Sequence, residues 1–334
     1  ICNNEKFSKH PGGFGISPYF QEQLLYLGQE GTYQEASQIT KRLLGLRVSA
    51  VQIYRLVHYY GQAIEADLNE VFEPKAAENA ITESVKSADS AVVYAMVDGA
   101  MILTDEGYKE NKLGRIFDDK SIKVSAIEDR GDSIESSLYT SHLGSSDDFI
   151  TKIKGHMDVH KSLGENLVFI SDGASWLKQM VQKQYPKATM ILDMYHVMHY
   201  VGTVAIAAFG TGNKATQWIE SQKKLLLDSQ HDAVLERIRK LKVDAQLRRL
   251  TYKYLESNRD RIDYKTYRER NLLIGSGAIE SAHRTVVQKR CKRSGQRWSL
   301  SGAQRVLNLR TCYMSNRWQI IRKHIEPYEH YFVA

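Results

Sequence analysis

The stretch AVVYAMVDGAMI, residues 91–102, decides the fold class of this chain. Ala91 to Val97 is a continuous apolar run with the length of a strand buried on both faces, and it ends at Asp98. A second run of this kind lies in NLVFISDGASW, residues 166–176, and ends at Asp172. The sequence therefore predicts a sheet in which two buried strands each end at an acidic residue.

The remaining elements follow in the order βββαβαβα. Extended segments are expected at 114–129 and 135–143, a helix near 148–163, a short strand at 167–170, a helix at 174–184 and a fifth strand within 188–196, which leads into a helix. This order, with acids at strand ends, is typical of a mixed α/β sheet of the ribonuclease-H-like class. The first and fourth strands of that topology are neighbours, so Asp98 and Asp172 are expected to lie close together.

Residues 1–80 are expected to form a helical N-terminal region that binds DNA. Thr32 with Glu35 makes a capping box, Gly45 is placed to end that helix, and Ser49 caps a second one. Helix, tight turn and helix form the outline of a helix-turn-helix, whose second helix enters the major groove. The groove-facing residues would be Ser49, Gln52, Arg55 and His58. The alternative is an αα-hairpin that only packs on the main domain.

Three further divisions are expected after a polar boundary at 75–90. Residues 91–200 would form the first part of the catalytic core, 201–271 an all-helical insertion, and 272–334 the C-terminal helices of the core. The insertion has the three-and-four spacing of amphipathic helices. Its charges would form a solvated face, with a few lining a path for DNA.

A third acid, Glu280, opens a basic helix in IGSGAIESAHRTVVQKR, where Ser276 is placed as a cap. Carboxylates are the ligands that Mg²⁺ prefers, and two such ions about 4 Å apart can activate an attacking hydroxyl and stabilise a leaving oxygen. Asp98, Asp172 and Glu280 are therefore the expected ligands of two Mg²⁺ or Mn²⁺ ions that act on phosphodiesters. Gly99 and Gly173 would let a nucleic-acid backbone approach closely. The alternative for a single Asp-Gly pair is a hairpin turn.

Positive charge is concentrated around Glu280. The chain carries a formal charge of +7 and a pI near 9.0, and the segment from Arg268 to Arg310 holds ten Lys or Arg against two acids. Such a field favours a polyanionic partner. The expected DNA-binding residues here are Arg284, Lys289, Arg290, Lys292, Arg293, Arg297 and Trp298. Trp298 would stack on an unpaired base, and the alternative is a core residue that anchors the following helix.

The segments around Glu280, with VDGAMI and ISDGASW, resemble bacterial insertion-sequence transposases of the DDE type, closest to the ISKra4 and ISLre2 families. The resemblance covers residues 91–318 and implies a ribonuclease-H-like catalytic domain with Asp98, Asp172 and Glu280 as catalytic metal ligands. Asp193 and His196, in LDMYH, are similar to a C/D-x-x-H motif of related elements. That similarity implies a catalytic role for His196 at the scissile phosphate, with Asp193 in support. A buried core role for His196 is the alternative.

The expected function is therefore a transposase that cleaves DNA at transposon ends and joins them to target DNA. The expected partners are double-stranded DNA, as terminal inverted repeats and target, and a second copy of the chain when two ends are synapsed, with no membrane. The alternatives are a nuclease of the same fold without joining activity and a domesticated DNA-binding protein. Cys2, Cys291 and Cys312 share no metal-ligand spacing and suggest no disulfide framework, which favours a reducing cytoplasm. The resemblance to bacterial transposases implies a place at the bacterial nucleoid.

Overall fold

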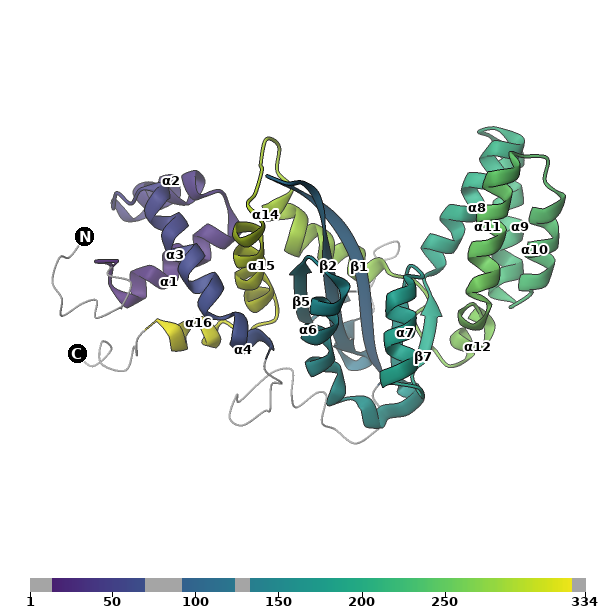
Figure 1. The fold of residues 1–334 in the computed structure, drawn as a ribbon, viewed down its shortest axis with the longest axis horizontal. Helices are drawn as coiled ribbons and strands as arrows, with labels where there is room; N and C mark the ends of the chain where they lie inside the picture. Colours follow the sequence, from purple (N-terminus) through teal and green to yellow (C-terminus); the bar gives the residue numbers. More distant parts are fainter. Residues whose placement is uncertain (1–13, 70–91, 124–132, 326–334) are drawn as a thin grey trace. The chain divides into compact units, whose positions relative to one another are not determined.

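The computed structural model describes residues 14–69, 92–123 and 133–325. The architecture is mixed α/β, with N-terminal helices, a five-stranded mixed sheet and a mostly helical C-terminal region (Figure 1). The chain divides into two compact units. The first comprises the described parts of residues 1–91, 98–160 and 279–334, and the second comprises residues 92–97 and 161–278. Strand β1 (Val93–Thr104) contributes residues to both.

Three N-terminal helices pack against one another, as Figure 1 shows. They are α1 (Pro18–Glu30), α2 (Tyr33–Leu44) and α3 (Ala50–Ala63), followed by the short α4 (Glu65–Asn69). The three end signals predicted from the sequence are confirmed. Thr32 and Glu35 form a reciprocal capping box, Gly45 ends α2 with a left-handed φ of 67°, and the Ser49 hydroxyl accepts the Gln52 N–H. The boundary predicted at 75–90 lies outside the described residues.

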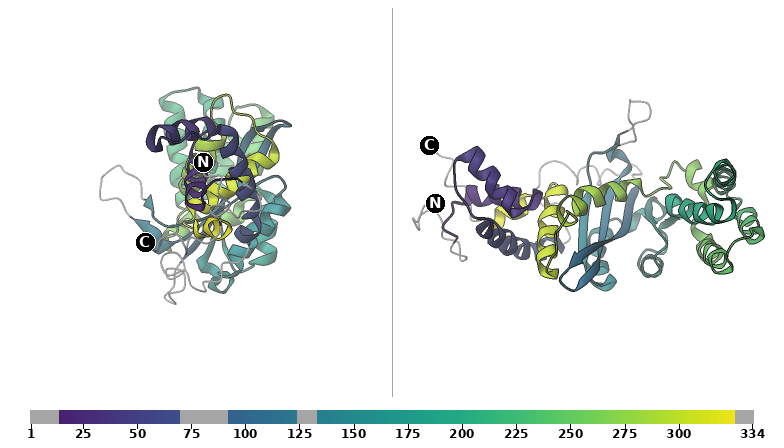
Figure 2. Two further views of the ribbon diagram at one scale, coloured as in Figure 1. Left: turned by 90° about the vertical axis from the view of Figure 1, so that its left-hand side faces the viewer. Right: turned by 90° about the horizontal axis from the view of Figure 1, so that it is seen from above.

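The sheet has the strand order β5-β2-β1-β6-β7, and its strands lie side by side in Figure 2. Its other members are β2 (Gly107–Asp118), β5 (Leu138–Leu143), β6 (Leu167–Ser171) and β7 (Thr189–Leu192). β1 is parallel to β6, β6 is parallel to β7, and β2 is antiparallel to β5. The predicted adjacency of the strands that lead to Asp98 and Asp172 is therefore confirmed, although β1 does not end at Asp98 as predicted.

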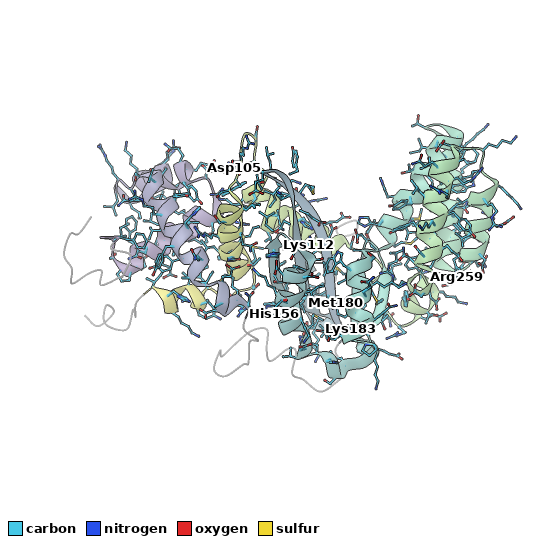
Figure 3. The ribbon with its side chains drawn as sticks, viewed as in Figure 1. Asp105, Lys112, His156, Met180, Lys183 and Arg259 are labelled. Atoms are coloured by element: carbon cyan, nitrogen blue, oxygen red, sulfur yellow. The ribbon has the colours of Figure 1, made fainter. Side chains whose placement is uncertain are left out.

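The prediction for the second strand was wrong in position. β1 continues for six residues beyond Asp98 and turns at Asp105 and Glu106 into β2, which begins at Gly107 rather than Gly114. Figure 3 labels Asp105 in this turn. The outer half of β2 alternates between partly buried and exposed residues, so it lacks the continuous apolar run by which the first strand could be found. A separate two-stranded ladder joins β3 (Ile122–Lys123) to β4 (Ser133–Ile134).

Helices of the first unit pack on strands β2 and β5. α6 (Ser146–Asp158) packs on β2 and β5, and α15 (Leu300–Met314) packs on β5 and α3. Gly61 of α3 lies so close to α15 that a Cβ there would be 2.4 Å from the backbone oxygen of Arg305. A glycine at this position is therefore a packing requirement. The remaining helices are α13 (Gly277–Ala282), the π-helix η5 (His283–Gln288), α14 (Lys289–Cys291) and α16 (Gln319–His324).

The second unit contains the start of β1, strands β6 and β7, and a group of helices. They are η3 (Lys161–Asn166), α7 (Ser175–Gln184), α8 (Met194–Phe209), α9 (Asn213–Leu227), α10 (His231–Lys240), α11 (Ala245–Ser257), η4 (Arg259–Arg261) and α12 (Tyr264–Glu269). Residues 201–271, predicted as an all-helical insertion, are helical with short connections and contain no strand. The end of this segment packs back on the sheet, because Tyr264 donates its hydroxyl to the Leu192 oxygen of β7. None of the helices within the described ranges is long and apolar enough to cross a bilayer.

Candidate metal centre

Asp172 lies at the carboxyl end of β6, where the backbone leaves the sheet. Its Oδ1 accepts the Ala174 N–H at 3.0 Å, and its backbone oxygen accepts the Tyr254 hydroxyl at 2.7 Å. Gly173 has a φ of 103°, and a Cβ there would lie 3.2 Å from both Leu192 and Tyr254. The turn after Asp172 therefore requires glycine for its own conformation and packing, so the approach of nucleic acid is not needed to explain Gly173.

The ladder between β1 and β6 brings Asp98 to the same place. Val97 pairs with Ser171 in parallel register, so the next residues, Asp98 within β1 and Asp172 just after β6, lie beside each other. Asp98 Oδ1 accepts the Gly99 N–H at 2.8 Å. A Cβ on Gly99 would lie 2.4 Å from a carboxylate oxygen of Glu110, but this is the end of a flexible side chain that can move aside, so packing does not require glycine there.

Asp98, Asp172 and His196 form a cluster suited to a metal ion. Each is partly buried, and each can offer one ligand atom such that the three atoms lie within 4.8 Å of one another. Two carboxylates and one imidazole suit a divalent ion such as Mn²⁺, and the carboxylates also suit Mg²⁺. Within the described chain this cluster does not include Glu280, so the ligand role predicted for Glu280 stays a prediction.

His196 is held by Asp193, a carboxylate with no exposed surface. Asp193 caps helix α8, accepting the backbone N–H groups of Tyr195 and His196, and its Oδ2 lies 2.5 Å from His196 Nδ1. The backbone N–H and hydroxyl of Ser276 donate to the same carboxylate at 2.8 and 2.7 Å. Burial opposes the charge of Asp193, but hydrogen bonds from His196 and Ser276 outweigh it and keep its pKa below the usual range.

This arrangement fixes which ring nitrogen of His196 faces the cluster. A charged Asp193 only accepts, so His196 Nδ1 carries the proton and Nε2 is the atom that can bind a metal ion. Carboxylate partners of this kind orient metal-binding histidines and raise their basicity. The interpretation of His196 as a core residue is not supported, since its side chain is 37% exposed. The Ser276 hydroxyl donates to Asp193, and its predicted role as a cap of the following helix stays a prediction.

Two partly buried tyrosines of the second unit support the backbone at Asp172. Tyr254 stacks on Tyr200 with ring centroids 4.0 Å apart, and burial together with the charge of Asp172 raises the pKa of Tyr254. Arg261 is 1% exposed and donates to Asn258. Both tyrosine and arginine come from the segment that the sequence identified only as an insertion, so that segment also shapes the site.

His283 is a site residue that the sequence analysis missed. It follows Glu280 by three positions, and its Nε2 lies 3.3 Å from Asp98 Oδ2. Its side chain is buried, whereas Glu280 is exposed on the same helix. An acid and a histidine three residues apart share one face of a regular α-helix, but a π-helix begins at His283, so the spacing could not reveal its position.

The basic residues predicted to bind DNA divide into exposed and buried groups. Those whose side chains reach the surface are Arg284, Lys289, Lys292, Arg293 and Arg297, and their DNA contacts stay predictions. Lys289 pairs with Glu30, and Arg293 forms a two-armed pair with Glu35. These pairs tie the basic segment to helices α1 and α2.

Arg290 and Trp298 are in the interior, so the surface contacts predicted for them were wrong. The Arg290 guanidinium lies 4.8 Å from the ring centroids of both Tyr33 and Trp298, and its Nε donates to the Gly28 oxygen. Trp298 donates its Nε1 to the Cys291 oxygen at 3.1 Å. Two aromatic faces and a carbonyl offset the desolvation of this cation, which its charge alone could not reveal.

Helix α3 (Ala50–Ala63) exposes some, but not all, of the residues predicted to face a DNA groove. Ser49 and Arg55 are exposed and Gln52 is partly exposed, so the groove-facing role predicted for them remains open to test. His58 was wrongly placed on that face. It is buried against α15, where Arg305 contacts its Nδ1 at 3.1 Å, and burial with that cation lowers its pKa to about 4.

Comparison with known proteins places the chain in a family. Residues 134–322 match the family described as "Uncharacterised protein family (UPF0236)". A protein of Streptococcus gallolyticus described as "UPF0236 protein in vanSb 3'region" is 25% identical over an alignment of 323 positions, which covers 93% of this chain and 67% of that protein. Because the family match covers more than half of the chain, the chain belongs to UPF0236. Neither description assigns an activity.

Proposed function

We propose that the protein is a DDE-type transposase that uses a divalent metal ion to cut DNA at transposon ends and to join the cut ends to a target. The observation that carries this proposal is the pair of carboxylates, Asp98 within β1 and Asp172 just after the adjacent parallel strand β6, with His196 beside them. Two acids and an imidazole clustered in this way are suited to holding an ion against a phosphate.

The sheet supports a ribonuclease-H-like core as the fold behind this site. In chain order the five sheet strands are β1, β2, β5, β6 and β7, so the first is adjacent to the fourth, as that topology requires. The strands after the first three are parallel to the first, with α6 and α7 in the connections between successive strands. The resemblance of the segments around Asp98, Asp172 and Glu280 to insertion-sequence transposases points to the same class.

In this proposal each residue has a separate task. Asp98 and Asp172 would hold the ion, and His196 would present Nε2 to it because Asp193 holds the Nδ1 proton. When bound, a divalent ion would supply the charge needed to activate an attacking oxygen and to stabilise a leaving oxygen in an in-line displacement. A two-ion site requires Glu280 as well, and its exposed position on α13 leaves its carboxylate accessible.

The partner in this proposal is double-stranded DNA, bound by the exposed basic residues of the first unit. Phosphate contacts from lysine and arginine supply affinity that depends on salt and little on sequence. Recognition of terminal repeats would then belong to helix α3, through Ser49, Gln52 and Arg55. Synapsis of two ends calls for a homodimer on DNA, and the bacterial nucleoid is the place where such a protein would act.

The test incubates purified protein with labelled duplexes carrying the ends of the encoding element and with a supercoiled target plasmid, in Mg²⁺, in Mn²⁺ or in EDTA. The proposal predicts metal-dependent cleavage and joined products that are lost in Asp98→Asn and Asp172→Asn. The matched control is Asp147→Asn, at an exposed position of α6. Cleavage without joining would identify a nuclease. DNA binding without either reaction would identify a DNA-binding protein and would refute the proposed enzymatic activity.

A further inference from the structure

The helix that carries Glu280 and His283 is not a uniform α-helix. Residues 277–282 are α-helical, residues 283–288 form a π-helix, and residues 289–291 return to α-helix. π-helical turns are rare and occur often at functional sites, because the wider turn changes the direction in which side chains point. His283 is the first residue of this turn.

Arg310 of α15 donates hydrogen bonds to the backbone of the π-turn. Its side chain is 1% exposed, its Nε donates to the Val286 oxygen at 2.6 Å, and its Nη2 donates to the Thr285 oxygen. Its Nη1 donates to the backbone and side-chain oxygens of Gln29, at 2.8 and 2.9 Å. A buried guanidinium is costly unless its donors are satisfied. The turn is therefore built into the packing of α1, α15 and the helix of His283.

The π-turn places a buried imidazole against a proposed metal ligand. His283 is 4% exposed, and its Nε2 lies 3.3 Å from Asp98 Oδ2. Neither ring nitrogen makes a hydrogen bond in the part of the chain that the structure describes, and the contact with Asp98 is a close approach within ion-pair distance. A buried polar group left in this state is uncommon and requires an explanation. Asp98, His283 and Arg310 belong to the same compact unit.

We propose that His283 is a positioning residue of the metal centre, which acts by holding the Asp98 carboxylate. This inference rests on the proposed role of Asp98 as a metal ligand. Asp98 Oδ1 accepts the Gly99 N–H, so His283 at Oδ2 restrains the second oxygen and fixes the plane of the carboxylate. Groups that hold a ligand in this way change metal affinity by about 10- to 100-fold when they are removed.

The geometry also sets His283 apart from His196. His196 belongs to the cluster whose ligand atoms lie within 4.8 Å of one another, and Asp193 holds its second nitrogen. Among the described residues of the cluster, His283 contacts Asp98 alone. Removing His196 should therefore remove a ligand, whereas removing His283 should leave three ligands in place but poorly aligned.

The test measures Mn²⁺ binding to the full chain by isothermal titration calorimetry, without DNA. His283→Leu is expected to weaken binding about 10- to 100-fold. His283→Gln, whose amide can donate to Asp98, is expected to recover most of the loss. Thermal unfolding followed by circular dichroism checks that each variant is folded. Binding by folded His283→Leu as tight as wild type would overturn the inference, and so would a His283→Gln loss as large as that of His283→Leu.

A measurement on the unchanged residue covers the case in which His283→Leu does not fold. In protein with ¹⁵N-labelled histidine, the His283 Nε2 resonance is expected to shift on saturation with Mg²⁺, and to stay unchanged in Asp98→Asn. No shift in the wild type would overturn the inference. If wild type and Asp98→Asn bind Mn²⁺ equally well, the metal-ligand role of Asp98 fails instead, so the two failures are distinguishable.

Discussion

Replacing Asp193 by Asn tests how the candidate site is held together, because it exchanges one carboxylate oxygen for an amide nitrogen of similar size. Oδ1 accepts the backbone N–H groups of Tyr195 and Ser276, and an amide oxygen can keep both bonds. Oδ2 accepts from His196 Nδ1, from the His196 N–H and from the Ser276 hydroxyl. An amide nitrogen in that position donates and cannot accept.

The structure sets the size of the effect. The Ser276 hydroxyl can turn its lone pair to the new amide, and the amide can donate to Nδ1, so the bond from the His196 backbone N–H is lost and the Nδ1 bond changes from a charged to a weaker neutral one. Hydrogen bonds to charged groups contribute about 1.5–3 kcal/mol each, and Asn remains a good helix cap. We expect the free energy of unfolding to fall by about 2–4 kcal/mol.

The effect on metal binding follows from the imidazole. In the Asp193→Asn variant the new side-chain amide donates to Nδ1, which moves the His196 proton to Nε2, and a protonated Nε2 cannot bind a metal ion. The substitution should therefore weaken Mn²⁺ binding by about 10- to 100-fold, as loss of an orienting carboxylate does elsewhere.

Urea denaturation followed by circular dichroism gives the first quantity, and calorimetric titration with Mn²⁺ gives the second. The matched control is Asp244→Asn, which changes an exposed Asp cap at the start of α11 that accepts only the Leu247 N–H. Its stability should change by less than about 0.5 kcal/mol, with metal binding unchanged. Wild-type Mn²⁺ affinity in folded Asp193→Asn would refute the reasoning about the tautomer.

Three further predictions concern other parts of the molecule. Gly61→Ala should destabilise the protein by about 1–3 kcal/mol, because the new methyl group meets the backbone oxygen of Arg305, whereas Gly202→Ala in α8, whose methyl meets only Ile219 at 3.9 Å, should stabilise it by about 0.5–1 kcal/mol in the same urea titration. Burial and the charge of Arg317 lower the pKa of His156 to about 4, so the stability that depends on neutral His156 (labelled in Figure 3) should be present above pH 6.5 and should fall by up to about 3 kcal/mol as the pH drops toward 4. His156→Gln should flatten that dependence, and an unchanged pH profile would contradict the assignment. Arg284→Ala and Lys292→Ala should each reduce the slope of log K for DNA against log salt by about 0.9, whereas an unchanged slope in fluorescence anisotropy would place the DNA elsewhere.

The core of the site could be predicted because it rests on local patterns. The apolar runs before Asp98 and Asp172 identify buried strands, and their adjacency follows from the order of the elements. The caps at Thr32, Gly45 and Ser49 are set by residues close in the sequence. Local signals of this kind are read directly from residue type and spacing.

What could not be predicted depends on tertiary contacts. Arg290 has the same charge as its exposed neighbours, and only the positions of Tyr33 and Trp298 make it an interior residue. The π-turn at His283 depends on donors from Arg310, which lies on another helix. The support of Asp172 by Tyr254 joins residues 82 positions apart.

The measurement that tests the central claim most directly is DNA-end cleavage by Asp98→Cys and Asp172→Cys in Mg²⁺ and in Mn²⁺. A thiolate is a soft ligand that hard Mg²⁺ binds poorly and that a transition-metal ion such as Mn²⁺ accepts more readily. If these residues bind the ion that cuts DNA, both variants should be inactive in Mg²⁺ and should regain cleavage in Mn²⁺. Cleavage in Mg²⁺ at the wild-type rate by either variant would contradict the account.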